Sequence, residues 1–431
     1  MNAEDRGIRR YQLILGIIFA VACIGYLIVV HVYGITTEVS KGYLPYANQL
    51  ADGNIPAMEY PQLALVFMAI PRIFSSTDFG YTTAFVAEVF VFFMIGLIVV
   101  GKLAKRYNQS QRKAMLIYTI LMLLMLEFVV DRYDIFPAVL TLISFYFLVT
   151  KQYVWAFVML SIATMTKVYP AVLFPIYLIP FVINRDWLNA LKGAGAFIII
   201  AILIILPFLL LNSDVAFHFI SYNMDRPIQI ESTAASAIAF ASTIGLTSFG
   251  IQSSLDYRSF GSDNALGPWA DSVMPYLTPL ILVILILIYA AYAYMLVKVR
   301  KEGKDNENIR MILLGGASLL AIMAFMIFGK VFSSQYLVWA IPFVGFLLMT
   351  SIDYKERRYI FILSVIAIIL SQLNFAVNIG ICGGGTGITD GGMMIILARN
   401  IVMLILFAYV IKTCVERVGK WPLRRTHVSE E

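Results

Sequence analysis

Four short strings place charged side chains directly beside apolar runs, where their chemistry could be used. Asp131–Asp134, Thr166–Pro170 and Lys330–Tyr336 each join two apolar runs with little chain between them, and Asp225–Ser232 lies early in a long polar segment. A charge costs about 2.5–3.5 kcal/mol at the centre of a lipid-spanning helix and less near its ends. Any one of these charges could be an interfacial anchor that reaches toward lipid headgroups. Four such strings on one side indicate a site.

The cations of these strings have the chemistry to hold a lipid-linked phosphate. Arg presents a planar fork to two phosphate oxygens, and Lys presents a compact point charge. The candidate phosphate-binding residues are Lys167, Arg226, Lys330 and Arg132. An acidic residue in the first long polar segment, 33–78, could then act as general base on an acceptor hydroxyl.

Aromatic side chains near the same strings could stack on a sugar ring. They are Tyr33, Tyr43, Tyr46, Tyr60, Tyr133, Tyr169, Tyr336 and Trp339. For each of them taken alone, an anchoring position at the membrane interface is the simpler interpretation.

The composition shows what kind of molecule must position these residues. Of the 431 residues, 60% are hydrophobic and 13% are charged, and the mean hydropathy is +0.83. A soluble domain is closer to half apolar and a quarter charged. The composition excludes a soluble protein and predicts an all-α, polytopic membrane protein that forms a single integral membrane domain over residues 1–431.

Long apolar runs bounded by charge predict about twelve transmembrane helices, because a span needs ~20 residues. The runs are 11–32, 79–101, 114–130, 135–150, 153–166, 170–183, 193–212, 275–297, 311–329, 336–352, 360–380 and 394–412. Residues 61–74 would reach only about 21 Å as a helix and contain Pro71 and Arg72. We therefore predict an interfacial helix there, inside the first of two long outer segments, 33–78 and 213–274.

The charges also predict an orientation. With the N-terminus in the cytoplasm, the inner segments hold 24 of the 32 basic residues, as the positive-inside rule requires. The C-terminus is then cytoplasmic too, and the extracytoplasmic side holds 13 of the 26 acidic residues but only seven of the basic ones. The net charge of +6 is therefore an orientation signal in a cell-membrane protein. It does not indicate nucleic-acid binding.

A series of weak motifs gives the sequence a family resemblance over roughly residues 30 to 345. The strings are Thr37-Glu38, Gly53-Asn54-Ile55-Pro56, Glu59-Tyr60-Pro61, Arg132 to Pro137, Thr166 to Pro170, Arg226 to Ser232 and Lys330 to Tyr336. In this order they resemble the polyprenol-phosphate-mannose-dependent mannosyltransferases that act on phosphatidylinositol mannosides, which have the glycosyltransferase C fold.

The resemblance implies an outer-facing enzyme that takes a sugar, mannose by preference, from a polyprenyl phosphate and inverts the anomeric centre. It also implies helices lying on the membrane in the first outer loop, which suits 39–52 and 61–74. The family base is usually an Asp after the first span, and Glu38 stands in the best-matching place, with Asp52, Glu59 and Asp134 as rivals. The matched strings add Gln229, Glu231 and Gln335 to the substrate-binding candidates.

Metal dependence and partners follow from the same residues. There is no Asp-x-Asp string and the three histidines are scattered, so no zinc site is expected. We expect no metal or other cofactor, with Mg²⁺ or Mn²⁺ held by carboxylates and the donor phosphate as the alternative. The expected partners are the polyprenyl-phosphate sugar donor, a lipid or glycan acceptor and membrane lipids.

Two other functions remain open from the sequence. One is a flippase for lipid-linked saccharides or a secondary transporter, but only Glu88, Glu127 and Arg399 lie inside spans, which is few for a charged path. The other is a related enzyme that polymerises or ligates glycans, or that transfers another hexose or a pentose.

Overall fold

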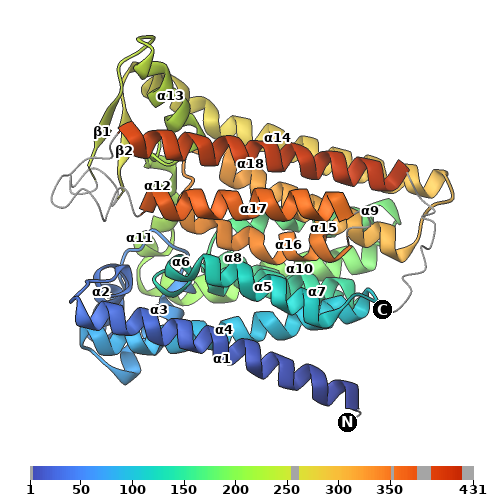
Figure 1. Ribbon diagram of the computed structural model, residues 1–431, viewed down its shortest axis with the longest axis horizontal. Coiled ribbons are helices and arrows are strands. Elements are labelled where there is room, and N and C mark those ends of the chain that lie inside the picture. The colour runs from blue at the N-terminus through green and yellow to red at the C-terminus, as the bar shows by residue number, and fades with distance from the viewer. Residues whose placement is uncertain (1–2, 254–261, 351–353, 376–389, 420–431) are drawn as a thin grey trace.

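The computed structural model of the protein describes residues 3–253, 262–350, 354–375 and 390–419, and most of these are helical (Figure 1). The all-α prediction is confirmed. The end of the predicted span 336–352, the end of 360–380, residues 254–261 of the second long outer segment and the last twelve residues of the chain lie outside the described residues.

Long and medium helices form the body of the bundle, and each predicted span overlaps one of them. They are α1 (Ala3–Val32), α4 (Asp78–Arg106), α5 (Gln111–Leu124), α7 (Ile135–Val149), α8 (Tyr153–Thr166), α9 (Leu173–Ile183), α10 (Trp187–Leu211), α14 (Pro268–Lys301), α15 (Glu307–Ile327), α16 (Leu337–Thr350), α17 (Tyr354–Phe375) and α18 (Asp390–Gly419).

Among the described residues, six helices are long and apolar enough to cross a membrane by length and composition, and shorter apolar helices accompany them. The count of about twelve spans therefore stays a prediction. The apolar runs predict where each helix lies, but they predict the residues at which it begins and ends less well. α4 continues through Lys105 and Arg106, and α10 begins at Trp187, where the Asp186 side chain accepts a hydrogen bond from the Asn189 amide. Polar caps and basic last turns lengthen a helix without adding hydropathy.

Short elements gather at one end of the bundle, which we call the loop end (Figure 1). They are η1 (Val39–Tyr43), α2 (Leu44–Ala51), α3 (Ala64–Phe74), α6 (Leu126–Val130), η2 (Tyr169–Val172), α11 (Ser213–Ala216), α12 (His218–Asp225), α13 (Thr233–Thr243), η3 (Ser334–Tyr336) and the strands β1 (Gly250–Gln252) and β2 (Asn264–Leu266). The helices predicted at 39–52 and 61–74 are thus present. The antiparallel β1–β2 pair was not expected, and the predicted span 114–130 is interrupted at Met125, between α5 and α6.

The opposite end of the bundle collects basic side chains, and we call it the basic end. There Lys105 of α4 lies 3.7 Å from Asp5 of α1, and Arg106 pairs with Glu307 at the start of α15. Arg300 of α14 donates to Asn184, just after α9, at 3.2 Å. The clusters predicted to share the cytoplasmic side therefore meet at one end of the molecule.

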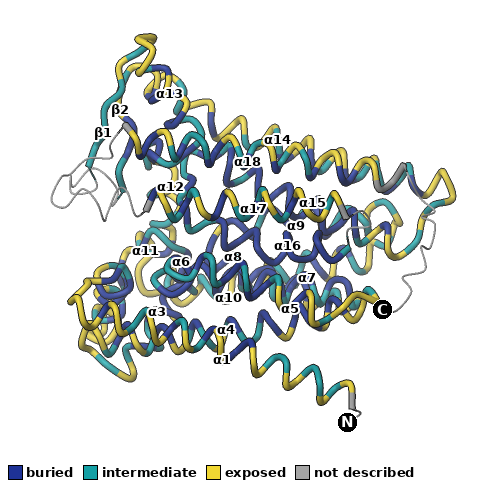
Figure 2. Tube along the Cα trace, in the orientation of Figure 1, coloured by how far each residue is buried: buried dark blue, intermediate teal, exposed yellow. Residues whose placement is uncertain are grey.

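Burial divides the helices into a central and a peripheral set (Figure 2). Nearly every residue of α7 and α16 is buried, so these helices are apolar all round. In contrast, α10 exposes most of its apolar side chains, as a lipid-facing helix does.

The helices α8 and α10 run side by side in the same direction but end at different heights. Phe157 of α8 lies against Gly193 of α10, and Ser161 Oγ donates to the Phe197 carbonyl at 2.8 Å. With this register, Thr166 at the end of α8 stands level with Ile202. Since α10 continues to Leu211, it extends past α8 at the loop end by about 13 Å.

Candidate active site

A buried ion pair forms the centre of the candidate site. Lys167 follows the end of α8, and its Nζ lies 2.6 Å from Oδ1 of Asp134, just before the start of α7. Trp339 of α16 donates its indole Nε1–H to the same oxygen at 2.6 Å. Asp134 is fully buried, and two of the four predicted strings therefore meet here.

Aromatic rings enclose the Lys167 ammonium. Its Nζ lies 4.6 Å from the ring centroid of Tyr133 and 5.1 Å from those of Tyr336 and Trp339. Tyr60 completes the cage at 5.7 Å. A ring face within about 6 Å attracts a cation, most strongly where water is excluded. The cage holds the ammonium in place without neutralising it.

Trp339 is itself fixed by stacking. Its ring lies between Tyr169, at 4.1 Å and nearly parallel, and Tyr336, at 3.9 Å. Tyr169 is buried and its hydroxyl lies 3.4 Å from that of Thr141. Tyr169, a predicted sugar-contacting residue, therefore supports Trp339 from below the site.

A second ion pair joins the first outer segment to the turn between α6 and α7. Arg132 Nη1 lies 2.6 Å from Oε1 of Glu38, whose side chain is 41% exposed. The Asp131 carboxylate accepts hydrogen bonds from the amides of Glu38 and Val39, at 3.2 and 3.3 Å. The turn thus holds Glu38 through both its side chain and its backbone.

The cations come close enough to act on one another. Burial lowers the pKa of the Lys167 amine, Asp134 opposes this, and Arg132 and Arg226 add to the lowering. Burial likewise lowers the pKa of Lys330, with Asp225 opposing and Arg226 adding to the effect. The four predicted phosphate-binding residues are therefore electrostatic neighbours, with Asp134, Glu38 and Asp225 among them, and we call these four cations the positive region.

Four candidate residues in this region each carry a buried polar atom that has no hydrogen-bond partner among the described residues. They are Tyr133 Oη, Asp134 Oδ2, Arg226 Nε and Gln229 Oε1. Buried polar groups are nearly always hydrogen-bonded, so unpaired ones call for an explanation such as a ligand.

Other predicted residues are engaged elsewhere. The Glu59 carboxylate accepts a hydrogen bond from the Tyr46 hydroxyl at 2.6 Å. The backbone N–H of Gln229 donates to the Lys330 carbonyl at 2.8 Å, and Lys330 Nζ donates to the Met224 carbonyl at 2.7 Å. Gln335 is half-buried in η3.

The Glu231 side chain binds partners inside the protein that the sequence did not indicate. Its Oε2 accepts from the Ser334 amide and hydroxyl at 2.8 and 2.6 Å, and lies 3.1 Å from Nη1 of the buried Arg399. The carboxylate is thus used inside the protein.

A comparison with known families decides the class of this protein. The profile of Glycosyltransferase family 87 matches residues 59–327, which is more than half of the chain. The chain belongs to glycosyltransferase family 87. No match was found among curated proteins.

Family membership makes this chain a membrane glycosyltransferase, and the matched region contains Arg132, Asp134, Lys167 and Arg226. Glu38 and Lys330 lie outside it, yet the fold brings both to the same positive region.

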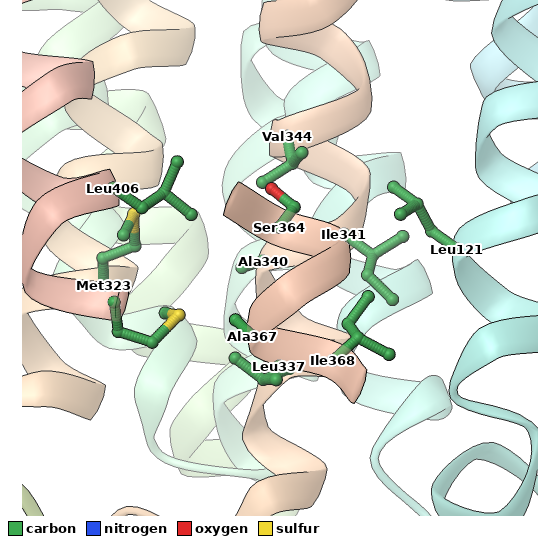
Figure 3. A pocket seen from close by; sticks show the side chains of 11 residues that line it. Leu121, Met323, Leu337, Ala340, Ile341, Val344, Ser364, Ala367, Ile368 and Leu406 are labelled. Atoms are coloured by element: carbon green, nitrogen blue, oxygen red, sulfur yellow. The ribbon is translucent and has the colours of Figure 1, made fainter. Parts of the chain in front are cut away.

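Two cavities of this family 87 glycosyltransferase lie in different parts of the bundle, one among apolar helices and one beside Glu38. One, of about 20 Å³, is lined by apolar side chains of α5, α15, α16, α17 and α18, with Ser364 as its polar member (Figure 3). It has room for about one water molecule. A second cavity, of about 190 Å³, lies between the end of α1 and the start of α4, and its lining includes Thr37 and Ser40, close to Glu38 in the chain. In the described part of the chain, no group of three or more His, Cys, Asp or Glu side chains could hold a metal ion.

The sequence missed two parts of the site. The roles of Asp131 and Trp339 depend on contacts between segments that are far apart in the chain. Asp131 lies 93 residues from its partner Glu38, and Trp339 lies 205 residues from its partner Asp134. Arg399 was visible as a charge in an apolar run, but its partner was not.

Proposed function

We propose that this glycosyltransferase moves a sugar, mannose by preference, from a polyprenyl phosphate to a lipid or glycan acceptor, at the extracytoplasmic face of the membrane and with inversion. The observation that carries the proposal is the positive region at the loop end. There the caged ammonium of Lys167 lies beside Arg132 and Arg226 and next to unpaired polar atoms.

The positive region suits the leaving group of such a transfer. A sugar phosphodiester carries one negative charge, and the polyprenyl phosphate that departs carries a second. Only one of the three ammonium protons of Lys167 is used by Asp134, and Arg132 uses Nη1 for Glu38. The remaining donors of these residues and the Nε of Arg226 can stabilise the developing charge.

Glu38 is the carboxylate best placed to act as base. Asp134 is buried, and its Oδ1 already binds Lys167 and Trp339, so it serves to hold the cation. Glu59 is bound to Tyr46. Glu38 is partly exposed beside Arg132, and can take the acceptor hydroxyl proton as the acceptor oxygen attacks the anomeric carbon. The bond from that carbon to the phosphate oxygen breaks, and its electron pair leaves with the polyprenyl phosphate.

The transporter alternative is weakened by the position of Arg399. This side chain was the basic member of the three charges within spans, and it is paired with Glu231 near the loop end. A charged path between the two ends would then have to rely on Glu88 and Glu127.

The test is transfer by the purified full-length protein. Polyprenyl-phosphate mannose carrying a labelled sugar is incubated with a membrane lipid extract, with GDP-mannose and polyprenyl-phosphate glucose as comparison donors. We expect labelled lipid or glycan from the first donor and the same yield in EDTA. Transfer from GDP-mannose alone would contradict the donor. Donor crossing liposome membranes with no sugar transfer would support the transporter instead.

A further inference from the structure

Arg399 on α18 is a buried charge outside the region matched by the family profile. Its side chain is fully buried within the mainly apolar middle part of the helix. An unpaired charge in such a place is strongly unfavourable. The contacts that satisfy it therefore indicate what it is for.

The Arg399 guanidinium forms hydrogen bonds with two loop segments at once. It binds the side chain of Glu231, at 3.1 Å from Nη1 to Oε2, and also the Glu231 carbonyl. It donates to Ser334 Oγ at 3.1 Å and to the Phe332 carbonyl at 3.2 Å. It also lies 4.2 Å above the Phe332 ring. One rigid planar group thus ties 226–232 to 330–336.

Neighbouring contacts complete the joint. Asn400 accepts from Arg399 at 2.9 Å and donates to the Glu231 carbonyl at 3.2 Å and to Ser236 Oγ at 2.9 Å. The two tied segments also bond directly, through Gln229 N to the Lys330 carbonyl at 2.8 Å.

The tied segments carry two of the cations of the positive region. Arg226 and Gln229 belong to the first, and Lys330 and Tyr336 to the second. Apart from the short η3, both segments are loops, so no long helix runs through them to fix their positions. The separation between Arg226, Lys330 and the Lys167 ammonium therefore depends on the joint at Arg399.

We propose that Arg399 is a positioning residue for the donor phosphate, acting through Glu231 and Ser334 to hold Arg226 and Lys330 at the site. The inference rests on the proposed phosphate donor. Lys has one point charge in place of the five-donor fork, so Lys cannot make the same set of bonds.

The test measures donor affinity and turnover separately in the full-length protein. Arg399→Lys keeps the charge but loses the fork, and we expect it to bind undecaprenyl monophosphate about tenfold more weakly, because small displacements at a binding site are costly. The donor KM should rise similarly, while kcat at saturating donor and the acceptor KM stay close to the original values. Arg310→Lys is the matched control, since Arg310 pairs with Asp305 at the basic end.

A coupling measurement separates positioning from general support of the fold. In an Arg226→Gln background, Arg399→Lys should weaken donor binding much less than it does alone, because both changes act on the same contact. The double variant Arg399→Met/Glu231→Gln removes both charges of the pair. It should unfold at a higher temperature than Arg399→Met but keep the weak donor binding.

Two results would overturn the inference. If Arg399→Lys lowers only the unfolding temperature and leaves donor affinity and donor KM unchanged, Arg399 supports the fold alone and the proposed function stands. If the unaltered protein binds no undecaprenyl monophosphate, the proposed donor fails, and the inference fails with it.

Discussion

The Lys167 ammonium and the Asp134 carboxylate form an ion pair, 2.6 Å from Nζ to Oδ1, that is almost closed to solvent. Removing one partner of a buried pair leaves the other charge uncompensated, which costs far more than the pair contributes. The pair is therefore both an anchor for the surrounding loops and the fixed point of the positive region.

The first prediction concerns stability. Lys167→Met should lower the free energy of unfolding by about 3–5 kcal/mol, because Asp134 is left charged and buried. The double variant Lys167→Met/Asp134→Leu should recover most of this loss but should not bind undecaprenyl monophosphate. Denaturant unfolding in detergent measures the stability. Lys105→Met, which breaks the exposed pair with Asp5, should change stability by less than about 1 kcal/mol. Equal losses at both sites would contradict the buried-pair argument.

The second prediction concerns the base. Glu38→Gln should lower kcat by about 10²–10⁴-fold, the contribution typical of a general base. Donor binding should persist, because the change removes a carboxylate that competes with the donor phosphate for Arg132. Radiolabelled sugar transfer under saturating donor measures kcat. Asp52→Asn, an exposed carboxylate after α2, serves as the control and should stay fully active. Full activity in Glu38→Gln together with its loss in Glu59→Gln would move the role to Glu59.

The third prediction concerns pH. The Lys167 ammonium binds phosphate and the neutral amine does not, so donor affinity persists below the pKa of Lys167 and falls as pH rises through it. Burial lowers this pKa, so the loss should occur below the ordinary lysine value of about 10.4. The donor KM measured between about pH 7 and pH 10 should therefore rise on the alkaline side.

Two arginine variants show which lysine causes the loss of donor affinity at alkaline pH. Lys167→Arg stays charged throughout the range and should remove the rise in donor KM. Lys330→Arg tests the other lysine whose pKa is lowered by burial. If only Lys330→Arg removes the rise, the titrating phosphate ligand is Lys330 and the prediction for Lys167 is wrong.

The fourth prediction concerns Trp339. Trp339→Phe keeps a ring between Tyr169 and Tyr336 but removes the hydrogen bond to Asp134. Losing a partner of a buried carboxylate should cost about 1–3 kcal/mol, measured as a lower midpoint of unfolding. Trp155→Phe is the control, because Trp155 is exposed on α8. An unchanged midpoint in Trp339→Phe would show that the indole N–H contributes nothing.

The sequence predicted the positions of the charges well because the turns between apolar helices are short. Arg132, Asp134 and Lys167 have almost no chain in which to move away from the helix ends, so the ends of α6, α7 and α8 must bring them together. Glu231 shows the limit of this reasoning. Its partner Arg399 lies 168 residues later, and no local pattern tells a carboxylate that binds substrate from one that binds a distant arginine.

The cage around Lys167 was likewise out of reach of the sequence. An aromatic residue at the end of a helix suits an interfacial belt equally well, and Tyr133, Tyr336 and Trp339 converge only once α7 and α16 are packed together. The β1–β2 pair was missed because each strand has only three residues, too few for a period to be seen.

The unequal lengths of α8 and α10 set the depth at which the reaction would take place. Beyond the level of Thr166, α10 still presents exposed leucines, ending with Leu210 and Leu211, and an apolar surface of that kind belongs in hydrocarbon. In the proposed orientation, Lys167 would lie about 13 Å below the loop end of α10, within one leaflet. A prenyl-phosphate donor already has its hydrocarbon chain in that leaflet, so only its phosphate would have to move inward from the headgroup level, whereas a water-soluble nucleotide sugar would have to descend without such an anchor.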